Sequence, residues 1–213
     1  MRTAIWYFDV ISPFAYLQAM RFGELPDNVE LVCKPTLFAG FLNHWGQLGP
    51  AEIPPKKIFT FRHALWRARK AGISYKTPPK HPFNPLRALR LAESGDGELS
   101  IVQSIFHSIW VDGNLPDDDA GFAAMGQAAG MADAETRVSD PNVKARVLQN
   151  GADAIAAGAF GVPTFVIDGE IFWGEDAFDM VLDYLANPGM FLTPEMAELD
   201  RLAPTAERKR PKS

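Results

Sequence analysis

The chain has 213 residues, of which 47% are hydrophobic and 22% are charged, and a globular protein of this size buries roughly 70% of its unfolded surface. Lysine and arginine number 21 against 26 aspartates and glutamates, giving a formal net charge of -5, which disfavours a nucleic acid partner. A single cysteine, Cys33, excludes an intramolecular disulfide, a CxxC redox pair and a multi-cysteine zinc site. We therefore expect a cytoplasmic globular protein.

The first part of the chain predicts a strand, a helix and a second strand. Residues 4–11 read AIWYFDVI, an aromatic and β-branched run typical of a strand, and Asp9 makes this run too short and too charged for a signal peptide or a membrane span. Ser12-Pro13 follows, and serine at the N-cap with proline at the first helical position is a helix start. The helix should reach Gly23, and residues 29–33 should form the second strand.

The middle of the chain, from Pro35 to about Gln149, predicts only helices. Apolar residues recur at helical spacing in residues 56–71, 86–93 and 99–109, and capping residues start two more helices, at residues 117–119 and 140–141. The four histidines, His44, His63, His81 and His107, are scattered without the spacing of metal ligands. We expect no metal site.

The last part predicts a hairpin and a final helix. Residues 163–173 read PTFVIDGEIFW, and Asp168-Gly169 between two apolar runs is a strong hairpin signal. A helix beginning at Glu175 should end near Asn187. We expect two domains and a tail: residues 1–36 with 149–192, a helical insertion of residues 37–148, and a polar, solvated tail of residues 193–213 that ends in a basic cluster.

The order βαβ, helical block, ββα resembles the thioredoxin fold. Four segments, in this order along the chain, point to one family with that fold. These segments are residues 7–16 (YFDVISPFAY), 50–56 (PAEIPPK), 160–165 (FGVPTF) and 173–176 (WGED). Together they resemble the 2-hydroxychromene-2-carboxylate isomerases, which group with the kappa-class glutathione transferases. The resemblance covers residues 2–192 and implies an α/β thioredoxin-like fold interrupted by an all-helical insertion, with a cis peptide bond before Pro163.

The resemblance implies that the Ser12 hydroxyl holds the sulfur of glutathione. A thiol with an ordinary pKa near 8.5 is only slightly ionised at neutral pH, and a hydroxyl donor at a helix N-terminus favours the thiolate. Pro13 and Phe14, which complete the motif, join Ser12 in the implied site. Without the resemblance, the dipeptide Ser12-Pro13 would indicate only that Ser12 is the N-cap of a helix. Dithiol oxidoreduction is excluded, because Ser12-Pro13-Phe14-Ala15 has no sulfur.

The resemblance also implies the remaining contacts with glutathione, each at a position that matches the family's motif. Val162, before Pro163, should pair its backbone with the cysteinyl backbone. Glu175 and Asp176 should meet the γ-glutamyl end, with Asp176 on its ammonium, and Lys56 should face the glycyl carboxylate. Without the resemblance, the acids would be helix-dipole partners and the lysine a solvated side chain. Gln47 stands where the family often has asparagine.

Aromatic side chains could line a pocket for a second, aromatic substrate, although tryptophan in apolar segments is more often part of the core. The candidates are Trp6, Trp45, Trp66, Trp110 and Trp173, with Asn43 and His44 in a loop after the second strand and His81 and Asn84 before the 86–93 helix. Cys33 should be a buried strand thiol.

The resemblance implies a glutathione-dependent isomerase that forms trans-o-hydroxybenzylidenepyruvate from 2-hydroxychromene-2-carboxylate or a related intermediate of aromatic degradation. Residues 50–54 and 172–174 favour the isomerase branch. One alternative is a kappa-like glutathione transferase or peroxidase, and another is a thioredoxin-like binding module without catalysis. Family analogy also implies a homodimer.

Overall fold

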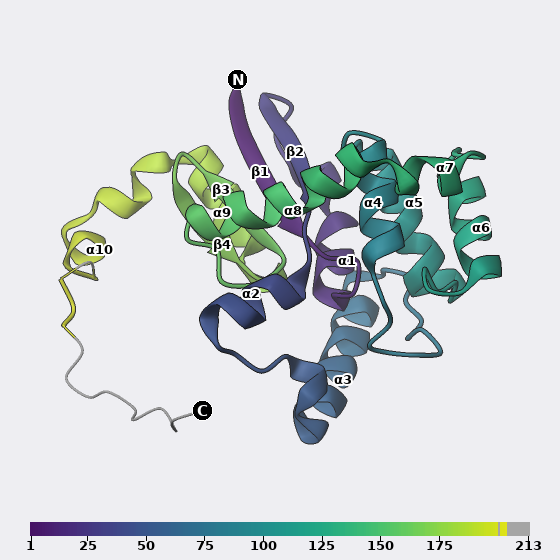
Figure 1. Ribbon diagram of the computed structural model, residues 1–213. Helices are drawn as coiled ribbons and strands as arrows, with labels where there is room; N and C mark the ends of the chain where they lie inside the picture. The colour runs from purple at the N-terminus through teal and green to yellow at the C-terminus, as the bar shows by residue number, and fades with distance from the viewer. Residues whose placement is uncertain (200, 204–213) are drawn as a thin grey trace.

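The computed structural model describes residues 1–199 and 201–203, and its centre is one four-stranded sheet (Figure 1). The strands are β1 (Arg2–Phe8), β2 (Val29–Pro35), β3 (Thr164–Ile167) and β4 (Glu170–Trp173). Their order across the sheet is β2-β1-β3-β4. The β1 and β2 strands are parallel, and the other two pairs are antiparallel. The expected thioredoxin-like arrangement, βαβ followed by ββα with helices inserted between them, is confirmed.

Most of the expected helices are present, but α1 ends at Ala19 instead of Gly23 and is followed by a separate short turn at Phe22–Glu24, and the helix expected from Glu175 starts with one tight turn before α9. The α-helices are α1 (Pro13–Ala19), α2 (Phe38–Trp45), α3 (Pro54–Ala71), α4 (Leu86–Ser94), α5 (Leu99–His107), α6 (Asp119–Ala128), α7 (Ala134–Ser139), α8 (Pro141–Ala156), α9 (Phe178–Ala186) and α10 (Pro194–Leu199). Side chains of Ser12, Asp118 and Asp140 cap α1, α6 and α8 as expected. The hairpin turn has positive φ at both Asp168 (53°) and Gly169 (88°), the conformation that Asp-Gly favours.

Three α-helices, α2, α7 and α10, were not expected, and the prediction that Asn43, His44 and Trp45 lie in a loop is wrong, because all three belong to α2. The N-cap residue of α2, Leu37, has no side chain that can cap, so the sequence gives no local start signal. A distant side chain supplies it, because the Asp9 carboxylate accepts the Phe38 N–H at 2.8 Å. The capping bond joins residues far apart in the sequence.

The sheet separates two apolar layers. Alternate β1 residues, Ala4, Trp6 and Phe8, enter the larger core because successive strand side chains point to opposite faces. This core also contains residues of α1, α4, α5 and α9. On the other face, Tyr7 packs with Phe41 of α2 and with α8 residues, and Figure 1 shows α8 crossing the sheet.

The helices α4 to α7 gather at one side of the sheet, and α3 extends away from it (Figure 1). The division into domains remains a prediction, and its boundary at residue 149 would fall inside α8, which is continuous from Pro141 to Ala156. In the expected tail, residues 194–199 form the exposed helix α10. Residues 200 and 204–213, including the basic cluster, lie outside the described residues.

Candidate functional site

Ser12 lies at the turn between β1 and α1. The residue is half-buried and is the N-cap of α1, with its Oγ accepting the Ala15 N–H at 3.3 Å. Its own N–H donates to the Asp9 carbonyl at 3.1 Å. The serine therefore has a fixed backbone and, among the described residues, one long side-chain hydrogen bond in which Oγ is the acceptor, so the hydroxyl proton is available for a ligand acceptor.

The bond between Val162 and Pro163 is cis, as the resemblance implied. Tyr7 pairs with Thr164 across the antiparallel β1 and β3 strands, so this bond lies at the end of the sheet where β1 leads into Ser12. The backbone N–H and C=O of Val162 have no hydrogen-bond partner among the described residues. An extended peptide could pair with them as an added strand.

The segment that begins at Gly174 lies beside the cis proline. The Gly174 N–H donates to the Pro163 carbonyl at 2.9 Å, and the Gly174 carbonyl accepts Nε2 of the buried Gln18 of α1 at 2.9 Å. Gly174 has a φ of 97°, a conformation in which glycine avoids strain. These bonds bring α1, the cis proline loop and Asp176 to the same end of the sheet.

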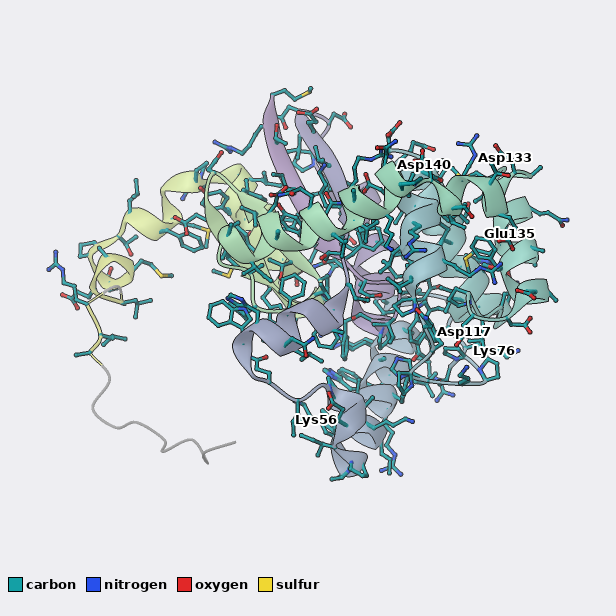
Figure 2. All side chains as sticks on the ribbon, in the orientation of Figure 1. Lys56, Lys76, Asp117, Asp133, Glu135 and Asp140 are labelled. Carbon is teal, nitrogen blue, oxygen red and sulfur yellow. The ribbon has the colours of Figure 1, made fainter. Side chains whose placement is uncertain are left out.

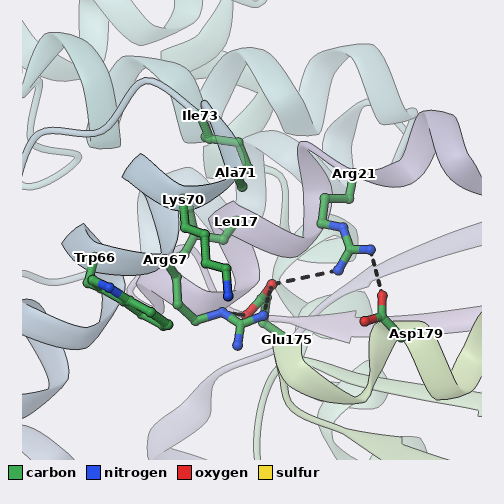
Figure 3. Close-up of a pocket in the computed structure, with 9 residues that line it drawn as sticks. All are labelled: Leu17, Arg21, Trp66, Arg67, Lys70, Ala71, Ile73, Glu175 and Asp179. Carbon is green, nitrogen blue, oxygen red and sulfur yellow. Dashed lines mark hydrogen bonds and ion pairs between the residues drawn. The ribbon is translucent and has the colours of Figure 1, made fainter.

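The two acids after Gly174 have different surroundings. Glu175 is only 5% exposed, Arg67 of α3 pairs with both of its carboxylate oxygens, and Arg21 lies 3.9 Å from Oε1. Figure 3 shows this carboxylate beside Arg67 and Arg21, among the residues that line a pocket of about 340 Å³. Asp176 is exposed and has no side-chain hydrogen bond or ion pair within the described part of the chain. Asp176 is therefore free for a ligand ammonium, whereas the Glu175 carboxylate is already neutralised.

Lys56 and Gln47 are both exposed. Lys56 lies in the first turn of α3 (Figure 2), and its neighbour Lys57 donates to the His81 carbonyl at 2.7 Å. Gln47 follows α2, and its N–H donates to the Leu42 carbonyl at 2.9 Å. Their side chains make no hydrogen bond or ion pair with another described residue, and the roles assigned to them remain predictions.

Pro13 and Phe14 form the start of α1. Pro13 is buried at the first helical position, and Phe14 is half-buried, with its ring centroid 5.4 Å from that of His63 on α3. The side chain of Phe14 thus packs against α3. This contact brings α3, from the helical part of the chain, to the start of α1.

The candidate aromatic residues divide into core and surface. Trp6 and Trp110 are fully buried, and their indole N–H groups donate to Gln18 Oε1 at 2.7 Å and to the Val10 carbonyl at 3.0 Å. Both are core residues, as the general preference of tryptophan indicated. Trp45, Trp66 and Trp173 are 39%, 55% and 53% exposed. Asn84 is also exposed, and its side chain accepts the Leu86 N–H at 3.1 Å, next to the start of α4.

Cys33 is buried on β2, as expected, and burial raises its pKa to about 12. Such a thiol is inert at neutral pH.

Two polar groups lie close to Ser12: Asp9, which sequence reasoning missed, and His81, which it named only as a candidate for the aromatic pocket. Asp9 is 1% exposed, and burial raises its pKa to about 7 against the opposing effect of hydrogen bonds from Phe38 and Ile11. His81 contacts the Ile11 carbonyl through Nε2 at 3.0 Å, and burial lowers its pKa. The available sequence signal was an acid inside an apolar run directly before Ser-Pro.

Among the described residues, no helix combines the length and the apolar character needed to cross a bilayer. The same residues contain no group of three or more side chains suited to hold a metal ion.

The sheet order, the helix that starts at Ser12 and the cis proline beside it define a protein of the thioredoxin fold. A family model described as a DSBA-like thioredoxin domain matches residues 3–186, and the chain belongs to this family.

Curated relatives confirm the resemblance seen in the motifs. The chain is 28% identical over 192 residues to 2-hydroxychromene-2-carboxylate isomerase of Sphingobium xenophagum, covering 86% of this chain and 98% of that protein. It is 23% identical over 206 residues to glutathione S-transferase kappa 1 of Rattus norvegicus, covering 86% and 91%. A solved 2-hydroxychromene-2-carboxylate isomerase superposes with a TM-score of 0.76 at 21% identity, covering 93% of this chain and 98% of that one. The structural likeness shows the shared fold.

Proposed function

We propose that the protein is a glutathione-dependent isomerase that converts 2-hydroxychromene-2-carboxylate, or a related aromatic intermediate, to trans-o-hydroxybenzylidenepyruvate. The observation that carries the proposal is the place of Ser12, at the same end of the sheet as the unpaired backbone of Val162 and the unpaired carboxylate of Asp176. Curated relatives named as 2-hydroxychromene-2-carboxylate isomerases match 83–86% of this chain, and they support this choice of reaction.

The residues present fit glutathione in charge and shape. The tripeptide has an extended backbone, an ammonium at its γ-glutamyl end and a carboxylate at its glycyl end. Val162 offers free backbone groups for pairing, Asp176 offers a carboxylate for the ammonium, and Lys56 offers an ammonium for the glycyl carboxylate. The carboxylate of Glu175 is already bound by arginines, so we assign the γ-glutamyl ammonium to Asp176 alone.

When bound, glutathione would supply a thiolate that adds reversibly to an electrophilic carbon, converts a double bond into a single bond that can rotate, and then leaves again. Ser12 donates its hydroxyl hydrogen bond to the sulfur and favours the ionised form. Phe14, packed against His63 of α3, gives the serine an apolar neighbour. The protein thus contributes an oriented, ionised nucleophile and an apolar side chain next to the serine.

A turnover experiment tests the proposal. Free thiol and product are measured together while the protein converts many equivalents of 2-hydroxychromene-2-carboxylate. We expect product to accumulate at constant total thiol, because the nucleophile is regenerated in every cycle. Loss of thiol in step with product would overturn the isomerase assignment.

The second candidate is a kappa-like glutathione transferase or peroxidase. The match to glutathione S-transferase kappa 1 over 86% of this chain favours it, and Ser12, Lys56 and Asp176 would serve it equally well. Stoichiometric consumption of thiol with an electrophile would identify a transferase, and consumption with a peroxide would identify a peroxidase. A thioredoxin-like binding module without catalysis would keep the fold and lose the ligand, so an absence of glutathione binding in calorimetry would identify it.

We also propose a cytoplasmic homodimer, which the resemblance implied. Light scattering of the full chain should give twice the monomer mass, and a monomer mass at all concentrations would contradict the dimer. Fractionation of the source cells tests the location.

A further inference from the structure

Asp9 lies directly beneath the turn that carries Ser12 and connects it to a second element. Its Oδ1 accepts the Ile11 N–H at 3.0 Å, and its Oδ2 accepts the Phe38 N–H at 2.8 Å. Its backbone carbonyl accepts the Ser12 N–H at 3.1 Å. One residue therefore fixes the turn before the serine and joins this turn to the first residue of α2.

The carboxylate is buried without a cation to balance it. It is 1% exposed, and no ion pair to it exists among the described residues. The ionisable groups near the turn are His81, which donates Nε2–H to the Ile11 carbonyl, and Lys57 of α3, which donates to the carbonyl of His81. The ionisable residue of α2, His44, is exposed in its last turn. Within the part of the chain that the structure describes, the hydrogen bonds to this carboxylate all come from backbone N–H groups.

Burial raises the pKa of Asp9 to about 7, although the two backbone hydrogen bonds lower it. A group with this pKa exchanges its proton with solvent in the range where a bound thiol would also ionise. Two negative charges in one partly buried site repel each other, so the loss of a proton from one group favours the uptake of a proton by the other.

We propose that Asp9 is a positioning and charge-balancing residue of the Ser12 site, whose carboxylate holds the serine turn and takes up a proton when the thiol bound at Ser12 loses one. The proton from the thiol leaves to solvent and the proton on Asp9 comes from solvent, so no bond to carbon or sulfur is made or broken. The inference rests on the proposed binding of glutathione.

Titration of Asp9 in the wild-type protein tests the coupling without a mutation. The side-chain carboxyl carbon of Asp9 is followed by NMR against pH in three states: free, with glutathione, and with ophthalmic acid, the tripeptide that has a methyl group in place of the thiol. We expect glutathione to raise the midpoint of Asp9 by at least about half a pH unit relative to ophthalmic acid. Equal midpoints with both ligands bound would overturn the inference and leave the proposed function intact.

Calorimetry on the same samples distinguishes a failure of the inference about Asp9 from a failure of the proposed function. Absence of glutathione binding would overturn both the proposed function and the inference that depends on it. Binding of both ligands with similar affinity, together with a midpoint shift for glutathione alone, is the result that we expect.

A variant of Asp9 tests the same coupling by the titration of the bound thiol. In Asp9→Asn, the bound thiol should titrate as a single group, whereas in the wild type its ultraviolet thiolate signal should rise over a wider pH range because two groups share one proton. The matched control is Glu93→Gln, which removes another buried carboxylate, held by Arg146 and Asn150 at 2.7 Å each. Its thiol titration should equal that of the wild type. Identical curves for Asp9→Asn and the wild type would contradict the coupling, and the NMR titration decides if Asp9→Asn does not fold.

Discussion

Replacement of Ser12 by alanine should have two separable effects, one on stability and one on a bound thiol. The Oγ of Ser12 accepts the Ala15 N–H at a long 3.3 Å, so the lost cap should cost about 1 kcal/mol or less. For a chain of this size, that loss lowers Tm by about 2–4 °C. A hydrogen bond to a charged group contributes about 1.5–3 kcal/mol, so the pKa of bound glutathione should rise by about one to two units.

Two further substitutions at the same position separate the roles. Ser12→Asp keeps a good N-cap but places a negative charge at the sulfur, so Tm should return to the wild-type value while the thiol pKa rises further. Ser12→Thr retains a hydroxyl and should preserve both properties. Thermal unfolding gives Tm, and ultraviolet absorbance of the thiolate gives the pKa. If glutathione binds but its pKa is the same in the wild type and in Ser12→Ala, the serine is only a helix cap and our reasoning is refuted.

The other predictions concern the acids and the cysteine. Asp176→Asn should weaken glutathione binding by about 0.2–1 kcal/mol in calorimetry, because the ligand ammonium loses its charged partner at an exposed position, and unchanged affinity would remove Asp176 from the site. Glu175→Gln should instead lower stability in urea unfolding by about 1–3 kcal/mol, because it leaves the partly buried Arg67 without a full counter-charge; wild-type stability would show that this pair contributes nothing. The pKa of Asp9 is about 7 in the folded chain and about 3.9 in the unfolded chain. Between these two pH values the folded chain binds one proton more than the unfolded chain. The free energy of unfolding should therefore fall by up to about 4 kcal/mol as pH rises from about 4 to about 7. Asp9→Asn should flatten this slope, and equal slopes in the two proteins would speak against a buried, ionising Asp9. Cys33 should react with a thiol reagent only on unfolding, since burial raises its pKa to about 12; fast labelling of the native protein would contradict its placement.

Local signals predicted the sheet and most helices well. Ser12 caps α1, Asp140 caps α8, and Asp168-Gly169 turns the hairpin, and in each case the residue type and the backbone conformation are local properties. The end of β1 was predicted too late, at Ile11 instead of Phe8, because Asp9 bends the chain through its bond to the Ile11 N–H. Local apolar patterning does not report such a bond.

The candidate site was harder to predict because adjacent residues of the same type have different partners. Glu175 and Asp176 are equivalent in sequence patterning, yet only Glu175 is buried against Arg67 of α3. Lys56 and Lys57 differ in the same way, because only Lys57 reaches the carbonyl of His81. These differences depend on which residues the fold brings together from distant parts of the chain.

The bonds that Ile11 and Asp9 make with His81 and Phe38 have a consequence for protein engineering. The serine turn is anchored at two points, the N–H of Phe38 and the imidazole of His81, and both belong to the inserted helical part of the chain. A chimera that combined these thioredoxin-like segments with the insertion of a relative would have to recreate both donors at the same places. The insertion therefore cannot be replaced by that of a relative without changing the site, because residues of both parts of the chain fix the position of Ser12.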